Sequence, residues 1–248
     1  MKIIALLFFL PLTLFSQNLL PFNVGEYSSF DISFRNIVVG SAELEVQKND
    51  IDSIGNSFHI IGKGRTAPFF DWFFKVRDVY ETFFDTSNVR PKKFIRRISE
   101  GGFQKQQLYS FYHSDDLVLV EDTSYAISKT TQDMLSALFF ARTFNKDSLV
   151  INKSFFIPIF MDEENFLLEV TYLYNEDILT EFGKISCLVF KPMMQEGRVF
   201  QDGEKMKIWI SNDKNNLLIK VETEIWAGTI NAIITETRNL KYPLSIIK

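Results

Sequence analysis

The chain has 248 residues, of which 46% are hydrophobic, and a formal net charge of -4. This balance supplies enough apolar side chains for a sizeable core and lacks the basic excess typical of nucleic-acid-binding proteins. Glycine and proline are few, at 11 and 7 residues, whereas phenylalanine reaches 26. The composition therefore excludes a low-complexity chain, and it predicts either a thick aromatic core or an apolar interior cavity.

The N-terminus has the layout of a secretory signal peptide. A lysine follows the initiating methionine, an apolar run extends from Ile3 to Phe15, and Ser16 offers a cleavage point. The run is shorter than the roughly 20 residues of a transmembrane helix, so an uncleaved anchor is the less favoured alternative. We expect residues 1–16 to be a signal peptide and residues 17–248 to form one β-rich domain, without a transmembrane span in the mature chain. A two-domain division at the predicted helix described below is the alternative.

A single cysteine, Cys187, limits the chemistry of the chain. It lies far from the apolar N-terminal run, so we expect no lipid anchor there, and one cysteine excludes an intramolecular disulfide or a multi-cysteine metal site. The surrounding segment, 185–190, is typical of a buried strand, which makes Cys187 a core residue rather than a nucleophile. We expect an exported protein of the periplasm or the outer-membrane periphery, with no cofactor and no metal.

Alternating apolar and charged residues dominate the mature chain. Residues 42–47 and 219–225 alternate cleanly, which predicts half-buried antiparallel strands. Similar segments lie at 27–34, 57–64, 76–84, 93–99, 104–112, 117–121, 153–160, 165–173, 184–190, 204–210 and 228–239. Polar clusters predict turns at 49–52, 113–116, 162–164, 175–177 and 211–216. The chain is predicted to be mainly β, with a large antiparallel sheet curled into a half-open barrel or a sandwich.

One segment, residues 130–143, departs from the strand period. Its apolar residues at 134, 135, 138 and 139 have the spacing of an amphipathic helix. Thr130 or Thr131 can cap its start, and Asp133 suits the positive end of the helix dipole. An apolar stripe normally faces a core, so we expect this helix to pack on the sheet.

Catalytic motifs are scarce. The two histidines, His59 and His113, belong to a strand and a turn, and the sequence holds no Gly-x-Ser-x-Gly elbow, His-Glu-x-x-His motif or phosphate-binding glycine loop. We therefore predict no catalytic residues. An enzyme is the least favoured hypothesis, and it would involve Asp78, Glu100 or Asp133 as a shifted acid.

The most informative segment carries the closely spaced aromatic residues Phe69, Phe70, Trp72, Phe73 and Phe74. Neither a helix nor a strand places all of them on one face. One alternative is a plug of packed side chains under a loop. The other is a functional hydrophobic surface, either the rim of an apolar ligand cavity or a tip that touches a membrane. We predict these five residues as the ligand-binding residues.

Charged residues flank the aromatic segment. Arg65, Asp78 and Glu100 are candidates for a polar site beside it. Ion pairs across neighbouring strands are the alternative explanation, and exposed pairs of this kind are common and energetically weak.

Several short stretches, in this order, resemble the domain-of-unknown-function family 3108 of bacterial exported proteins. They are Val24–Glu26 followed by a strand and Gly40, Arg65–Thr66 leading to Phe70–Asp78, Arg97 with Glu100–Gly102, Gln132–Ala137, Gly183 with Cys187 and Pro192, and Met206–Ser211 with Asp213. Together they cover nearly all of the mature chain. The resemblance implies a β-rich exported domain, and because the family carries no established activity, it implies no catalytic residues.

These observations favour a non-enzymatic envelope protein that binds or carries a hydrophobic small molecule or lipid in an apolar cavity. The alternative is a structural or assembly factor that pairs with an envelope protein partner through an exposed strand edge. We expect no nucleic acid as a partner.

Overall fold

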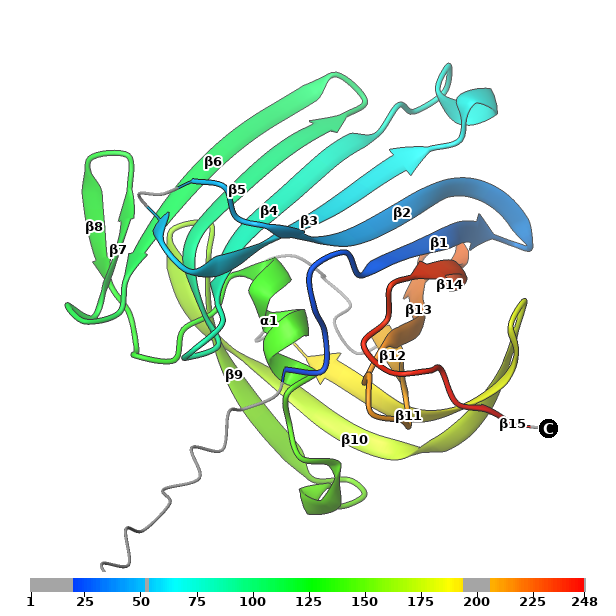
Figure 1. Cartoon of the computed structure of the whole chain (residues 1–248). Helices are drawn as coiled ribbons and strands as arrows, with labels where there is room; N and C mark the ends of the chain where they lie inside the picture. The colour runs from blue at the N-terminus through cyan, green and yellow to red at the C-terminus, as the bar shows by residue number, and fades with distance from the viewer. Residues whose placement is uncertain (1–19, 52–53, 194–205, 248) are drawn as a thin grey trace, which may run out of the picture.

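A large antiparallel sheet makes up most of the protein (Figure 1). The computed structural model describes residues 20–51, 54–193 and 206–247, so the predicted signal peptide, 1–16, lies outside the described residues. The strands are β1 (Tyr27–Phe34), β2 (Ile37–Lys48), β3 (Ser57–Thr66), β4 (Arg77–Asp85), β5 (Arg90–Glu100), β6 (Phe103–Tyr112), β7 (Leu117–Val120), β8 (Thr123–Ala126), β9 (Ser154–Met161), β10 (Glu164–Thr180), β11 (Gly183–Met193), β12 (Met206–Ser211), β13 (Leu218–Ile225), β14 (Gly228–Arg238) and β15 (Ile246–Ile247). The predicted mainly β fold is confirmed.

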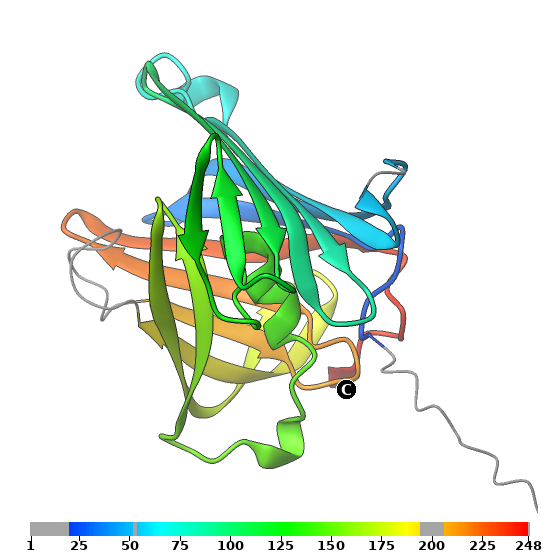
Figure 2. The ribbon, with the colours of Figure 1, turned by 90° about the vertical axis from the view of Figure 1, so that its left-hand side faces the viewer.

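The sheet is a continuous path of hydrogen-bonded neighbours that curls around a concave face (Figures 1 and 2). Its order is β8-β7-β6-β5-β4-β3-β2-β1-β14-β13-β12-β11-β10-β9, with β15 beside β11. Strands β8 and β9 end this path, so over the described ranges the sheet does not close through strand pairing. This is the half-open barrel that the sequence predicts.

The alternation of apolar residues decides which side of the sheet faces inward. Val46, Ile60, Thr82, Phe94 and Tyr109 are register neighbours across β2 to β6, and all five are buried on the concave face. Because successive side chains of a strand point to opposite faces, the residues between them form the outer face. A row of buried side chains thus forms one wall of the core.

Helix α1 (Met134–Ala141) lies against the concave face and contacts β3, β4, β5 and β9 (Figure 1). Asp133 caps its start: its side chain accepts hydrogen bonds from the backbone N–H groups of Leu135 and Ser136 at 2.8 and 2.7 Å. The predicted caps Thr130 and Thr131 are therefore wrong, because the helix begins at residue 134, too far along the chain for either to reach its free N–H groups.

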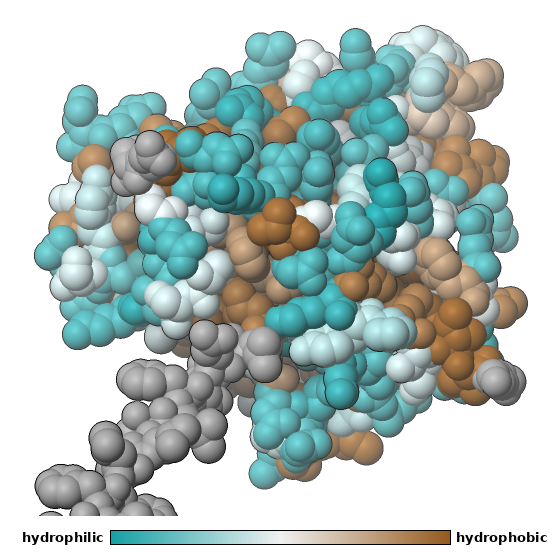
Figure 3. Space-filling view, in the orientation of Figure 1, coloured by the Kyte–Doolittle hydropathy of each residue, from teal (hydrophilic) through white to brown (hydrophobic). Residues whose placement is uncertain are grey.

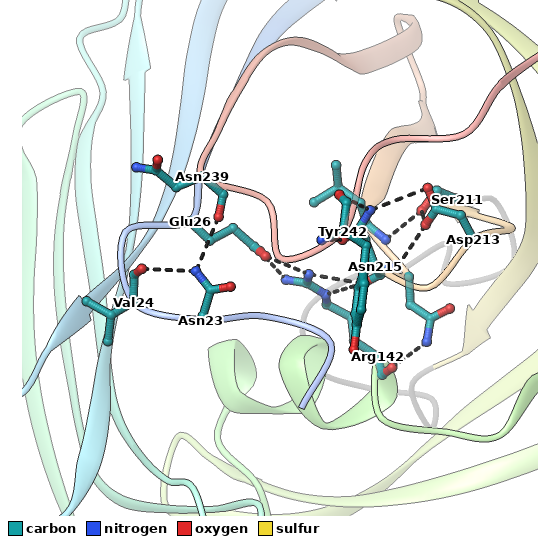
Figure 4. Close-up of polar contacts among 11 residues, drawn as sticks. Asn23, Val24, Glu26, Arg142, Ser211, Asp213, Asn215, Asn239 and Tyr242 are labelled. Atoms are coloured by element: carbon teal, nitrogen blue, oxygen red, sulfur yellow. Dashed lines mark hydrogen bonds and ion pairs between the residues drawn. The ribbon is translucent and has the colours of Figure 1, made fainter. Parts of the chain in front are cut away.

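Both ends of α1 are fixed to the sheet by buried polar contacts. The Thr82 hydroxyl of β4 donates to Asp133 at 2.6 Å, within a fully buried environment. Arg142 follows the helix and pairs with Glu26 at 2.6 Å, and both side chains are only 4% exposed. Arg142 also donates to the backbone oxygen of Asn215 in the β12–β13 turn (Figure 4). The helix is thus tied to β4, to the start of β1 and to that turn.

The structure differs from the sequence prediction at one predicted turn and at one short strand. The polar cluster 175–177 is not a turn, because β10 continues through it to Thr180. The strand carries a bulge between Tyr172 and Tyr174, and Glu176 accepts a hydrogen bond from the Trp209 indole at 2.7 Å. The short strand β8 was not predicted. Polar residues on the exposed face of a long strand have the composition of a turn, which explains the first error.

The Glu26–Arg142 pair generates a stability prediction. Glu26→Gln or Arg142→Met should lower the free energy of unfolding by about 3–5 kcal/mol, because removal of one partner leaves the other charge buried without compensation. Urea denaturation measures the change. Asp177→Asn, which removes the exposed Lys184–Asp177 pair, is the control and should cost less than about 1 kcal/mol. Equal, small effects in all three variants would show that the buried pair is unimportant.

Asp133 generates a pH prediction. Burial raises the pKa of its carboxyl group from the ordinary value of 3.8 to about 6. The folded protein therefore holds this proton more tightly than the unfolded chain, and stability from this group falls as pH rises from about 4 to about 6. The difference corresponds to about 3 kcal/mol at most. Asp133→Asn should flatten the dependence of unfolding free energy on pH in that window, whereas an unchanged slope would contradict the assignment.

Candidate functional site: an aromatic rim and a polar inner face

The aromatic segment forms the loop between β3 and β4. It begins with the short helix η2 (Pro68–Phe70), whose first residue is the proline favoured at that position. At the base of the loop, Asp71 accepts a hydrogen bond from the Thr66 hydroxyl at 2.6 Å and pairs with Arg77 at 2.5 Å. The hydrogen bond from Arg77 is the main reason why the pKa of Asp71 lies below its usual value. These contacts fix the loop at its base.

The aromatic side chains of this loop are exposed rather than packed beneath it. Phe69, Trp72 and Phe73 are 76%, 80% and 79% exposed, and Phe74 is 48% exposed. Only Phe70 is half-buried. The plug of packed side chains is therefore not what the structure contains, and the assignment of these residues to ligand binding stays a prediction.

Further apolar residues surround this loop. Alternate hairpin tips of an antiparallel sheet lie at the same end, and the β1–β2, β5–β6 and β13–β14 tips join the β3–β4 loop there, on the left of Figure 2. Arg35 donates to the backbone oxygen of Ala227 at 3.0 Å, and the Phe74 ring lies directly against Gly101. We call this surface the aromatic rim; it consists of Ile37, Val38, Phe69, Trp72, Phe73, Phe74, Phe103, Ile225 and Trp226.

The space-filling view shows part of the same surface. Hydrophobic residues gather at the upper right, whereas much of the remaining face is hydrophilic; the hydrophobic group low on the right lies beside the C-terminus and is not part of the rim (Figure 3). Trp226, at the β13–β14 tip, is 96% exposed. Scattered exposed apolar residues are ordinary, but a cluster of large aromatic side chains on adjoining tips is typical of a binding surface.

Behind the rim, the concave face carries two of the three predicted polar residues. Asp78 is buried and accepts a hydrogen bond from the Ser99 backbone N–H at 2.9 Å. Burial, and then the neighbouring Asp78 carboxyl, raises the pKa of Glu100. Arg65 does not join them: it pairs in register with Arg77, and thus points to the outer face, where it contacts Glu43. The structure brings Asp78 and Glu100 together and separates Arg65 from both.

Sequence reasoning missed two buried polar residues of this face. Arg96 on β5 and Gln107 on β6 are register partners and are 9% and 7% exposed. They meet the β9–β10 turn: Arg96 lies 3.5 Å from Asp162, and the Gln107 amide donates to Asp162 at 3.2 Å and to Glu163 at 3.0 Å. The predicted turn at 162–164 is present, but it bridges the open side of the barrel instead of standing in solvent.

The charge of Asp162 is stabilised in this position. Burial opposes its ionisation, yet the hydrogen bond from Lys105 at 2.6 Å and the charge of Arg96 hold its pKa below the usual value. Its backbone N–H donates to the Tyr109 hydroxyl at 3.0 Å. The turn is therefore held to β5 and β6 by side chains where strand pairing is missing.

An apolar cavity of about 50 Å³ lies beside α1. Its walls include Leu138, Phe144, Phe155, Phe190 and Ile210, and none of the predicted aromatic ligand-binding residues lines it. Pockets for small organic ligands usually span about 300–1,000 Å³, so this cavity is too small for a lipid. The rim and the polar inner face, which carry the predicted aromatic residues and two of the predicted polar ones, are therefore the candidates for binding.

Other reactive side chains have structural partners. Cys187 is buried in β11, as predicted, and burial raises the pKa of its thiol to about 12. His59 hydrogen-bonds to Glu81 at 2.6 Å, and His113 hydrogen-bonds to the Pro91 backbone oxygen at 2.8 Å. Within residues 20–51, 54–193 and 206–247, no helix has the length and apolar character needed to cross a membrane.

Comparison with solved structures finds similar proteins, one of which is described as barrel-like. The crystal structure of a beta-barrel-like protein of domain of unknown function DUF1849 from Brucella abortus has a TM-score of 0.55 at 10% sequence identity, over 86% of this chain and 97% of that chain. A DUF1089 family protein from Pseudomonas aeruginosa has a TM-score of 0.43 at 10% identity, over 75% of this chain and 90% of that chain. The first of these similarities shows the fold alone.

Comparison with sequence families identifies the family of the chain. The model of a family described as "Protein of unknown function (DUF3108)" matches residues 29–235. A search of curated proteins finds no match. The match extends from β1 into β14 and so includes the β3–β4 loop, the inner face and α1.

The exposure of the rim generates a stability prediction. Replacing Trp72 and Phe73 together by Ser should change the free energy of unfolding by less than about 1 kcal/mol, because both side chains are already in water. Phe84→Ser, at a fully buried position, is the control and should cost about 3–5 kcal/mol. Thermal and urea unfolding of the lipid-free proteins measure both. A double variant as unstable as the control would mean that the loop packs in solution.

Proposed function

Because the chain belongs to the DUF3108 family of proteins of unknown function, we propose a function from its geometry: it is a non-enzymatic envelope protein that binds a hydrophobic, lipid-like ligand at the aromatic rim. The exposure of Phe69, Trp72, Phe73 and Trp226 on adjoining tips is the observation that supports this proposal best. Water-exposed aromatic side chains at one end of a barrel-like sheet suit a ligand with a substantial apolar part.

The energetics of the rim are adequate for such binding. Covering a Phe or Trp side chain with apolar groups contributes about 1.5–3 kcal/mol. Two rim residues such as Trp72 and Phe73 would then contribute about 3–6 kcal/mol, and further members of the rim would add to this. Part of the gain offsets the lost freedom of the ligand, so we expect moderate affinity.

The proposed location follows from the N-terminal sequence. A signal peptide at residues 1–16 would export the protein, and the periplasm or the periphery of the outer membrane would offer lipid-like ligands. Trp and Phe side chains at hairpin tips would suit contact with a lipid surface, because aromatic rings partition well into the region between water and hydrocarbon.

An assembly role through strand addition is the second candidate. The terminal strands β8 and β9 are its possible sites, and Phe156 on β9 is 56% exposed. However, β8 has only 4 residues, and the backbone of Gln132 occupies part of the β9 edge through hydrogen bonds with Pro158 and Phe160. Short or covered edges accept new strands poorly, so we favour lipid binding.

A lipid-retention experiment tests the proposal. Lipid-free protein is incubated with vesicles of phosphatidylethanolamine and phosphatidylglycerol and then re-isolated, and the retained lipid is measured by native mass spectrometry. Trp72→Ser with Phe73→Ser should lower retention about tenfold, equivalent to about 1.4 kcal/mol. Leu179→Ser is the matched control, because Leu179 is 78% exposed but lies at the β10–β11 tip, outside the rim. Wild-type protein that retains no lipid, or a rim variant that retains as much as the control, would refute the proposal.

A further inference from the structure

Two buried polar atoms on the inner face have no hydrogen-bond partner among the residues that the structure describes. They are the Nε atom of Arg96 and the Oε1 atom of Gln107. As whole residues Arg96 and Gln107 are 9% and 7% exposed, and the two atoms themselves are buried. A buried donor or acceptor without a partner costs about 1–3 kcal/mol, so such groups usually serve a bound molecule or water. Here one donor and one acceptor occur on register partners of neighbouring strands.

The two atoms can serve the same ligand group. Arg96 and Gln107 stand directly opposite each other on β5 and β6, so their side chains share the concave face with Cβ atoms about 4.5–5.5 Å apart. One atom donates a hydrogen bond and the other accepts one. A small polar group between them could therefore satisfy both.

A path of half-exposed residues leads from the aromatic rim to this pair. On the concave face of β5, Glu100 and Ile98 lie between the rim and Arg96, and both are half-buried. Arg96 lies about 13 Å from Glu100 along the strand, at about 3.3 Å per residue. On β3, a Cβ atom added to Gly64 would meet no atom within 4 Å, so the inner face is open there.

The surrounding charges decide which chemical class fits. Carboxyl groups outnumber cations on this face: Asp78, Glu100, Asp162 and Glu163 lie there with Lys105 and Arg96 itself. The Arg96 charge already faces Asp162 at 3.5 Å. An anionic group would be repelled by the net negative charge. A cation could not accept the hydrogen bond that Arg96 Nε offers. A neutral hydroxyl both accepts and donates, and so matches the pair.

We propose that Arg96 and Gln107 form a subsite for a hydroxyl group on the polar head of the lipid-like ligand. The hydroxyl oxygen accepts from Arg96 Nε, and its O–H donates to Gln107 Oε1. The head lies on the inner face and the apolar part of the ligand extends toward the aromatic rim. This inference rests on the proposed function, because it takes the lipid-like ligand as given and specifies its head.

Two probes with the same acyl chain test the subsite. Monoolein carries free hydroxyls on its glycerol head, and methyl oleate carries none. Titration of each into lipid-free protein, followed by tryptophan fluorescence, gives the two dissociation constants. We expect wild-type protein to bind monoolein about tenfold more tightly, since satisfying buried polar groups contributes about 1–3 kcal/mol.

Variants of the pair and a matched pair on the outer face complete the test. Arg96→Lys keeps a positive charge opposite Asp162 but removes Nε, and Gln107→Met removes Oε1 at similar volume. Both should abolish the preference for monoolein and leave methyl oleate binding unchanged. Arg97→Lys and Gln106→Met are the controls, because these residues are also register partners on β5 and β6 but face outward. Both controls should keep the preference, and thermal melts verify that each variant is folded.

The possible outcomes separate the two proposals. Equal binding of both probes by wild-type protein would overturn the hydroxyl subsite and leave lipid binding intact. A monoolein preference that survives in both Arg96→Lys and Gln107→Met would also overturn it, and would mean that the pair holds only water. Binding of neither probe would count against the proposed function itself.

Discussion

Two buried carboxylates hold the helix that fills the open barrel. Asp133 caps the start of α1 and accepts a hydrogen bond from Thr82, and Glu26 pairs with Arg142 just after the helix ends. A curled sheet that is not closed by strand pairing needs an element packed on its concave face. The contacts of Asp133 and Arg142 determine which face of α1 packs against the sheet. Removing either partner of a buried ion pair is costly, so the position of the helix is strongly specified.

The position of the helix divides the protein into two regions of different character. Around α1 the described interior is packed, with a cavity of only about 50 Å³. Toward the hairpin tips of β1 to β6, the concave face is half-exposed and carries polar residues that include Asp78 and Arg96. The aromatic rim lies at the same end. Because the described core around α1 is already filled, the proposed hydrophobic ligand would bind at this end of the molecule.

Most strands were predictable because one face of each is buried. Residues 42–47 alternate in sequence, and β2 places Val46 inward as that alternation requires. The prediction failed where polar residues serve a structural purpose: Glu176 belongs to β10 and binds Trp209, although its neighbours have the composition of a turn. Helix α1 was predictable from its period, but its cap was not, since Thr130, Thr131 and Asp133 are all good capping residues.

The candidate site was only partly predictable, for a related reason. The aromatic segment is conspicuous in the sequence, but the exposure of Trp72 depends on how the loop leaves β3. Arg96 and Arg97 are neighbouring residues of the same type. They differ only in the face of the strand to which each side chain points. In β5, Arg96 shares a face with Phe94, which is buried. An arginine on the apolar face of a strand was the available signal, whereas its pairing with Gln107 and Asp162 required the register and the fold.

The central claim is that a lipid-like molecule occupies the aromatic end of the protein. The most direct measurement is native mass spectrometry of protein purified from cells without detergent, followed by organic extraction and identification of what was bound. The account predicts a bound amphiphile that carries at least one hydroxyl group. Protein that is consistently free of any lipid-like molecule, in preparations that remain folded, would contradict it.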